Sequence, residues 1–230
     1  MPVILSFDIG IRNLAYCLAR WDVNEGDTTV QLPRCETLAL DTEVLALGVI
    51  DVTTYLDPGP PIRNINKIQI LKLARALIRA LDANVPCILT KVDTIDHVII
   101  ENQPCMKNPR MKSVQMLLFG YFVKLGLLDS AVIQNACMFQ PRDKLTVYVG
   151  EPVECNLKSK YGRRKRLSIE YTRRMLMSNE KASDALAIFE NEPKKDDIAD
   201  AYLQALTFIR QRFLKKQRKR VQKRHMVVSI

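Results

Sequence analysis

Residues 3–10 read VILSFDIG, and this stretch indicates the fold of the chain. Val3–Phe7 is an apolar run with strand composition, and it ends at Asp8. A second strand is predicted over Asn13–Trp21 and a third over Val30–Leu40, and the short polar connections between them are typical of an antiparallel meander. The chain is therefore expected to open with three adjacent strands, the first of which ends on an acid.

The rest of the chain alternates helix and strand patterns. Apolar residues recur at helical spacing in four segments, and two short apolar runs indicate further strands. The predicted helices are Asn64–Asp82, Asn108–Gly126, 164–178 and 195–220, and the predicted strands are Asp96–Glu101 and Ala131–Phe139. Gly126 is the expected C-cap of the second helix, residues 140–160 are expected to be a loop, and 181–190 a short helical turn.

These elements predict an α/β fold with a mixed five-stranded sheet flanked by helices. A chain of 230 residues is long enough for one well-buried domain and short for two. We expect that domain to span residues 1–210, followed by a basic C-terminal extension at 211–230.

Composition argues against several classes of protein. No apolar run approaches the ~18 residues that a membrane-spanning helix needs, so no membrane is expected among the partners. The six cysteines form no C-x-x-C pair and only two histidines are present, which disfavours a structural zinc site. The N-terminal residues carry no secretion or import leader, which favours a cytoplasmic protein. A mitochondrial location is the alternative if a leader has been trimmed.

The positive charge is concentrated in two segments. The net charge is +10, and residues 210–224 hold nine Lys and Arg with no acid. Residues 158–174 hold eight Lys and Arg with one acid, so the remainder of the chain is net negative. Such segregation indicates a surface that binds a polyanion. For 210–224, a solvated tail or a localisation signal is the alternative.

Four acidic residues fall where a nuclease needs them. Asp8 and Glu101 close predicted strands, and Asp197 and Asp200 lie three residues apart on one face of the last helix. If the first and fourth strands are neighbours, their ends place the two strand acids side by side. Clustered carboxylates repel unless cations lie among them, and oxygen ligands suit Mg²⁺ or Mn²⁺. Two such ions ~4 Å apart would support hydrolysis of a phosphodiester that leaves a 5′-phosphate and a 3′-hydroxyl.

Each acid also has a structural interpretation. Asp8 could be a turn residue, and Asp196 and Asp197 at a helix start could be caps. Capping is the preferred interpretation of Asp196, because one residue rotates it ~100° away from Asp197 around the helix. Asp200 and Glu101 are harder to explain in this way, because both follow apolar residues and a half-buried acid needs a partner.

Several motifs resemble those of the RuvC-like Holliday-junction resolvases, and most closely the branch of poxviruses and other large cytoplasmic DNA viruses. They are FDIGIRN at 7–13, IENQP at 100–104, KNP at 107–109, MKS at 111–113 and DDIADA at 196–201. The basic segment Tyr161–Ser168 is also similar to that branch, and the resemblance runs from residue 3 to about 210. The N-terminal helical module of related fungal mitochondrial resolvases is absent, which again favours the viral, cytoplasmic reading.

This resemblance implies an RNase H-like fold and a homodimer that makes paired symmetric nicks in four-way junction DNA. It implies that Asp8, Glu101, Asp197 and Asp200 are catalytic and bind Mg²⁺, for which Mn²⁺ would substitute. Part of the apolar stripe of helix 109–126 is a candidate for the dimer interface, although most of that stripe is expected to be core.

A basic residue in the segment 160–166 is implied to assist at the scissile phosphate. Lys165 is the first choice for this catalytic role, while Lys160 and Arg164 stay open. Gln103 follows the strand acid directly and would help to position metal or phosphate. The residues expected to contact DNA are Arg12, Gln103, Lys107, Lys112, Lys158, Lys160, Arg163, Arg164 and Arg166.

Three other functions share some of these signals. Another RNase H-like nuclease, such as one that cuts RNA–DNA hybrids, would carry the same acids, and the extended motif around Glu101 argues against it. A nucleic-acid-binding protein with an inactive nuclease fold is disfavoured by the full set of four acids. A sugar kinase or ATPase of the actin-like type would need a second glycine-rich phosphate loop, and none is visible among the eight glycines.

Overall fold

The computed structural model describes residues 1–21, 38–59, 64–104, 106, 108–140 and 144–214. Its centre is one five-stranded sheet in the order β3-β2-β1-β4-β5. The strands are β1 (Val3–Asp8), β2 (Leu14–Trp21), β3 (Thr42–Ile50), β4 (His97–Glu101) and β5 (Ala136–Phe139). The first three pair antiparallel, while β4 is parallel to both β1 and β5. The predicted mixed sheet of an RNase H-like fold is confirmed.

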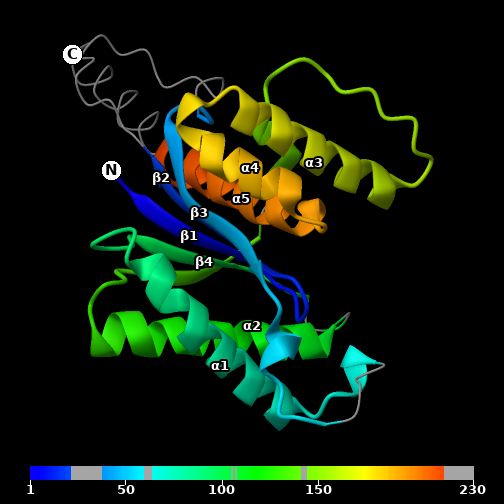
Figure 1. Ribbon diagram of the computed structural model, residues 1–230. Coiled ribbons are helices and arrows are strands. Elements are labelled where there is room, and N and C mark those ends of the chain that lie inside the picture. The colour runs from blue at the N-terminus through cyan, green and yellow to red at the C-terminus, as the bar shows by residue number, and fades with distance from the viewer. Residues whose placement is uncertain (22–37, 60–63, 105, 107, 141–143, 215–230) are drawn as a thin grey trace, which may run out of the picture.

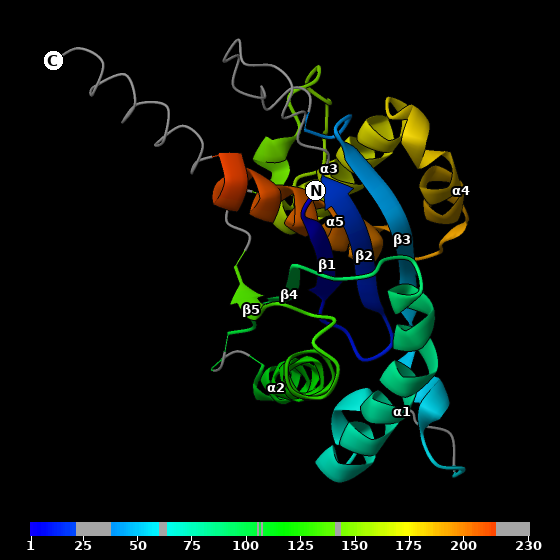
Figure 2. The same ribbon diagram turned by 90° about the vertical axis from the view of Figure 1, so that its left-hand side faces the viewer.

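Five α-helices cover the two faces of this sheet in the described part of the chain. They are α1 (Ile70–Leu89), α2 (Pro109–Phe122), α3 (Lys160–Met177), α4 (Ser183–Asn191) and α5 (Lys195–Ile209). Helices α3, α4 and α5 lie on one side and α1 and α2 on the other (Figure 1), and Figure 2 shows the same two layers from the side. Short helical turns are η1 (Val52–Tyr55), η2 (Ile65–Lys67), η3 (Val123–Asp129), η4 (Lys144–Val147), η5 (Glu180–Ala182) and η6 (Arg210–Leu214).

The alternation of side chains along β1 builds one core on each face. Ile4 packs with α5 and its neighbours, whereas Leu5 and Phe7 pack with α1 and α2. The amide of Gln204 ties α5 to β1, since its Nε2 donates to Ser6 Oγ and to the Phe7 carbonyl, each at 3.1 Å. Helix α5 is therefore fixed across the strand that carries Asp8.

The third strand was predicted in the wrong place. Strand β3 spans Thr42–Ile50, and it pairs with the whole of β2, from Leu14↔Ile50 to Trp21↔Thr42. Of the predicted range Val30–Leu40, the described residues 38–40 form a turn, and 30–37 lie outside the described residues. The position of β3 is decided by its pairing along the full length of β2, and the composition of the segment alone does not show that pairing.

The helix limits also differ from the predictions. Helix α1 begins later and runs past Asp82 through Pro86, because the burial of Val85 and Ile88 stabilises its last turns. Gly126 is not a C-cap: it lies inside the π-helical turn η3, where an added Cβ would lie 2.4 Å from the Cβ of Ile133. Close packing therefore requires glycine at that position.

The second half of the chain also differs from the predictions. The helix predicted over 195–220 ends at Ile209 and continues as the π-helical turn η6 to Leu214, and residues 215–220 lie outside the described residues. Residues 181–190 form the turn η5 and the nine-residue helix α4 rather than one short turn. Strand β5 covers only the end of the predicted Ala131–Phe139, and Ile133 makes an isolated bridge to Ile95. Helix α3 starts at Lys160, before the predicted 164, because Ser159 accepts a hydrogen bond from the Gly162 N–H as its N-cap.

By length and composition, one helix among the described residues could cross a membrane: Pro109–Asp129, with a mean hydropathy of 1.3 and 28% of its apolar window buried. Its inner side belongs to the core, where Val114, Leu118 and Phe122 are buried against β1 and β4 neighbours. Core helices of globular proteins meet the same test, so the finding is weak evidence for a membrane span.

Candidate active site

Two acids meet at the carboxyl ends of β1 and β4. The parallel register pairs Phe7 with Ile100, so Asp8 and Glu101 follow at adjacent positions. The two carboxyl groups lie side by side, and the Asp8 side chain is partly buried. Burial raises the pKa of Asp8 well above its ordinary value, and the charges of Glu101 and Asp200 raise it further. The predicted meeting of the two strand acids is thus found in the structure.

Helix α5 supplies the third acid of this cluster. Asp200 lies one turn into α5, close enough to Asp8 to raise its pKa. The Oδ2 atom of Asp200 is 2.5 Å from Nζ of Lys144, whose side chain is only 13% exposed. The positive charge of Lys144 partly offsets the effect of the acids on the pKa of Asp8. We call Asp8, Glu101, Asp200 and Lys144 the acid cluster.

Lys144 was missed by the sequence analysis. It lies in the turn η4, within the segment 140–160 that was predicted only as a loop. The sequence offers one signal that could have revealed it. Lys144 lies a few residues after the predicted strand Ala131–Phe139, and it is followed by the apolar residues Leu145 and Val147. Apolar residues so soon after a strand pack into the core nearby, which would keep Lys144 close to the end of that strand. Val147 is indeed buried.

Asp197 lies next to the acid cluster, because it is three residues before Asp200 on the same helix. Its side chain is half-buried, and its pKa is raised by burial first, then by the charges of Asp196 and Asp200, while Lys165 and Lys194 oppose the rise. Asp8, Glu101 and Asp200 therefore meet where β1 and β4 end, whereas Asp197 interacts with this group only through the charge of Asp200 on the same helix.

The acid cluster suits a hard cation by its chemistry. Within the described ranges, no group of three or more His, Cys, Asp or Glu side chains is arranged to hold one ion. The donors that do meet are carboxylate oxygens, the ligands preferred by Mg²⁺ and Mn²⁺. Burial is the first cause of the raised pKa of Asp8, the charges of Glu101 and Asp200 add to it, and Lys144 opposes it. The residues fit a divalent cation, which would supply positive charge.

Lys165 and Asp196 form a second ion pair beside the cluster. Nζ of Lys165 on α3 contacts Oδ2 of Asp196 on α5, and it also lies 5.1 Å from the ring centroid of Tyr161. The hydrogen bond that Lys165 donates to Asp196 raises the pKa of Lys165. Asp196 lies in the first turn of α5, as the helix-dipole interpretation expected, but it is not a cap: no side chain caps α5, and this carboxylate pairs with Lys165 across two helices.

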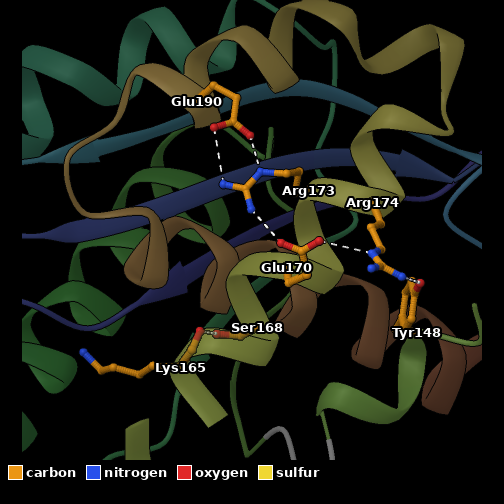
Figure 3. Close-up of polar contacts among 7 residues, drawn as sticks. All are labelled: Tyr148, Lys165, Ser168, Glu170, Arg173, Arg174 and Glu190. Atoms are coloured by element: carbon orange, nitrogen blue, oxygen red, sulfur yellow. Dashed lines mark hydrogen bonds and ion pairs between the residues drawn. The ribbon is translucent and has the colours of Figure 1, made fainter. Parts of the chain in front are cut away.

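A chain of polar contacts connects α4 and α3 to the segment after η4 (Figure 3). Arg173 bridges Glu190 on α4, with Nε 2.6 Å from its Oε1, and Glu170 on α3, with Nη1 2.8 Å from its Oε2. Glu170 also binds Arg174, which donates to the Tyr148 hydroxyl at 3.3 Å. The Tyr148 ring stacks on that of Tyr171, with the centroids 4.2 Å apart.

These contacts hold the segment that carries Lys144. Tyr148 fastens it to α3, and on the other side Arg210 donates to Thr146, to the carbonyl at 2.7 Å and to Oγ1 at 2.6 Å. Lys144 is thus placed against Asp200 by anchors on both α3 and the end of α5. The segment 140–160 is irregular, but its first described turn is anchored to the fold.

The predicted DNA-contacting residues divide into two groups. Gln103 and Lys112 are partly buried and bond within the protein: Gln103 Nε2 donates to Glu101 Oε2 at 2.6 Å, and Lys112 Nζ donates to Asn102 Oδ1 at 3.0 Å. Lys107 lies outside the described residues. The exposed group is Arg12, Lys158, Lys160, Arg163, Arg164 and Arg166.

Similar proteins include two viral ones and a bacterial one. An uncharacterized protein of Acanthamoeba polyphaga mimivirus is 37% identical over 126 residues, which are 50% of this chain and 29% of that relative, so the match spans under a third of its length. The fowlpox virus resolvase, solved with its substrate Holliday junction DNA, is 22% identical over 92% of this chain and 99% of that chain, with a TM-score of 0.48. Thermus thermophilus RuvC is 12% identical over 91% and 96% of the two chains, with a TM-score of 0.48.

Family membership comes from the sequence match. The model of the family described as "Poxvirus A22 protein" matches residues 2–212, which include all four acids, Lys144 and the exposed basic residues of α3. The match covers far more than half of the chain. This chain therefore belongs to the poxvirus A22 protein family.

Proposed function

We propose that the chain is a Holliday-junction resolvase, an endonuclease that makes paired symmetric cuts in four-way DNA junctions. The observation that carries the proposal is the meeting of Asp8, Glu101 and Asp200 at one end of the sheet, with basic helix α3 alongside. Buried carboxylates that need positive charge and a neighbouring surface for polyanions are what phosphodiester hydrolysis requires.

The acids would hold divalent metal, with Mg²⁺ as the expected ion and Mn²⁺ as its substitute. Asp8, Glu101 and Asp200 are the first ligands by position, and Asp197 lies next to them. The bound ions would supply Lewis acidity and a nucleophilic water for in-line attack on the phosphodiester. The chain itself orients Glu101 through the hydrogen bond that Gln103 donates to it.

Lys144 is the basic residue that the geometry favours at the scissile phosphate. Its Nζ already lies in the acid cluster, and its ammonium has three donors, more than its contact with Asp200 uses. A phosphate that enters beside Asp200 would accept one of them. Lys165, held by Asp196, would contact the DNA one helical turn away from this point.

DNA would bind along the exposed basic face of α3. Lys160, Arg163, Arg164 and Arg166 are exposed there, and Lys158 precedes the helix. Contacts of this kind neutralise phosphates and release counterions, so affinity should fall steeply with salt. Junctions would be selected by shape and deformability, because arginines and lysines on phosphates carry no base sequence information.

The homodimer would form through the outer side of α2. Met116 is 47% exposed, and an added Cβ at Gly120, one turn further on, would meet no atom within 4 Å. Leu127 and Leu128 extend this exposed apolar surface into η3. A four-way junction has approximate two-fold symmetry, which a two-fold dimer with two identical sites matches. Met116→Glu should convert the dimer to a monomer in analytical ultracentrifugation, and a dimer that persists would contradict this interface.

The deciding experiment compares substrates. The protein is incubated with Mg²⁺ and an immobile four-way junction, a linear duplex or an RNA–DNA hybrid. We expect paired symmetric cuts in the junction alone, which disappear in Asp200→Asn. Asp184→Asn is the matched control, because Asp184 is an exposed acid on α4 and its loss should leave cleavage unchanged.

Each of the other outcomes contradicts the proposal in a different way. If the protein cleaved the RNA–DNA hybrid and left the junction intact, it would be a ribonuclease, and the catalytic role proposed for the acid cluster would still hold. Tight, salt-sensitive binding of the junction without cleavage in Mg²⁺ or Mn²⁺ would make it a binding protein.

A further inference from the structure

A fully buried amide lies in the middle of α2. Gln115 has no exposed surface, although its neighbours on the helix, Val114 and Leu118, belong to the apolar core. An amide buried without hydrogen bonds costs about 1–3 kcal/mol. The contacts of Gln115 therefore indicate what holds it there.

Gln115 accepts hydrogen bonds from the chain that leaves β4. Its Oε1 is 2.8 Å from the backbone nitrogen of Gln103 and 3.2 Å from Nζ of Lys112. Lys112 also donates to Asn102 Oδ1 at 3.0 Å, and the Asn102 N–H donates to the Phe139 carbonyl at 2.9 Å. The two residues that follow Glu101 are thus fixed by α2 and β5.

Fixing the backbone of Gln103 places its side chain. Its Nε2 donates to Oε2 of Glu101 at 2.6 Å, and the Glu101 carboxyl in turn lies beside that of Asp8. Three links therefore run from the buried amide of α2 to the acid cluster: Gln115 to the Gln103 backbone, the Gln103 side chain to Glu101, and Glu101 to Asp8.

We propose that Gln115 is a positioning residue for the metal site: it holds Gln103, and through it one oxygen of the Glu101 carboxylate, in the orientation that a divalent cation requires. This inference rests on the proposed metal role of Glu101. Residues that orient a metal ligand change metal affinity or activity by about 10–100-fold when they are removed.

Mn²⁺ binding without DNA tests the proposal, measured by calorimetry or by the electron spin resonance of free Mn²⁺. Gln115→Met keeps the length of the side chain and removes its acceptor, and it should weaken Mn²⁺ binding about 10–100-fold. Gln103→Met should weaken it to a similar extent. The double variant should bind about as well as Gln103→Met alone, because both substitutions interrupt the same path.

The matched control is Asn179→Leu. Asn179 is another buried amide, and its Nδ2 donates to the carbonyls of Ala39 and Thr42 at 2.8 and 2.7 Å, away from the acid cluster. Its loss should lower Tm about as much as Gln115→Met does and leave Mn²⁺ affinity unchanged. Gln115→Glu, which keeps an acceptor for the Gln103 N–H and Lys112, should bind Mn²⁺ more tightly than Gln115→Met does.

Two results would overturn the inference. Mn²⁺ affinity that is unchanged in Gln115→Met, with a Tm lowered as in Asn179→Leu, would leave Gln115 a purely structural residue. Additive losses in the double variant would separate Gln115 from Gln103. If Asp8→Asn leaves Mn²⁺ binding unchanged, the proposed metal site itself fails and the inference with it, so the two failures are distinguishable.

Discussion

Two lysine–aspartate pairs lie one turn apart on α5, and their surroundings differ. Asp200 pairs with Lys144, which is 13% exposed and lies among Asp8 and Glu101. Asp196 pairs with Lys165, which is 38% exposed and comes from α3. Lys144 lies beside the acids that meet at the strand ends, whereas Lys165 lies near Asp196, Asp197 and the ring of Tyr161.

The difference shows that the role of a residue on a helix depends on which other helix, strand or turn packs against its side chain. Positions i and i+4 of a helix share a face, so sequence alone treats Asp196 and Asp200 almost alike. Only Asp200 points to where β1 and β4 end. The pair of Asp200 and Lys144 should therefore affect the rate of cleavage, and the pair of Asp196 and Lys165 should affect the affinity for DNA.

The largest expected effect comes from the two aspartates. Asp200→Asn should lower junction cleavage by about 10³-fold, because a lost metal ligand removes several kcal/mol of transition-state stabilisation. Asp196→Asn should lower it by about fivefold or less, since a partly exposed ion pair contributes little. Single-turnover cleavage of a labelled junction measures both. Equal losses would remove the distinction between the two pairs.

The two lysines sharpen the comparison. Lys144→Met should lower kcat by about 10²-fold with little change in affinity, because it removes a donor at the reacting phosphate. Lys165→Met should mainly weaken junction binding and reduce the salt slope by about 1. Binding titrations at several salt concentrations, together with single-turnover rates, separate the two effects. The reverse pattern would return the catalytic role to Lys165, the first choice that the family resemblance implied.

The pKa of Asp8 predicts a pH-dependent stability in metal-free protein. Its pKa is raised on folding, so the folded form binds the proton more tightly and loses stability as pH rises from about 3.9 through the raised value. Asp8→Asn removes this loss, and its amide can still donate to Glu101. Tm in EDTA should rise by about 3 °C at neutral pH and not at all near pH 3.5. If Asp8→Asn instead lowered Tm at neutral pH, the charged Asp8 would not be unfavourable in the folded protein, and the prediction would be wrong.

The smallest expected effect tests the anchor of Lys144. Tyr148→Phe keeps the stacking on Tyr171 and loses the hydrogen bond from Arg174, which is about 1 kcal/mol at most. Cleavage should fall about two- to fivefold. Tyr148→Ala loses both contacts and should approach the effect of Lys144→Met on kcat without weakening junction binding. Full activity in Tyr148→Ala would mean that Arg210 holds the segment alone.

Local pattern predicted much of the fold, and its errors have physical reasons. Strands β1, β2 and β4 were placed within a few residues because each contains a compact apolar run, and helix α2 because its apolar residues recur at helical spacing. Strand β3 was misplaced, since the partner of β2 is decided by pairing along its full length. Gly126 was predicted to be a C-cap, but glycine is required there because the side chain of Ile133 packs against its Cα. A local pattern does not show that contact.

The sequence by itself determined the candidate acids at the strand ends and on the last helix, and the basic segment that became α3. Their motifs are local, so spacing along the chain was enough to find them. Only the tertiary structure decided which lysine meets which acid, and that Gln115 supports Gln103. Those contacts join segments that are 12 to 56 residues apart in the chain, and their distances depend on how helices pack on the sheet.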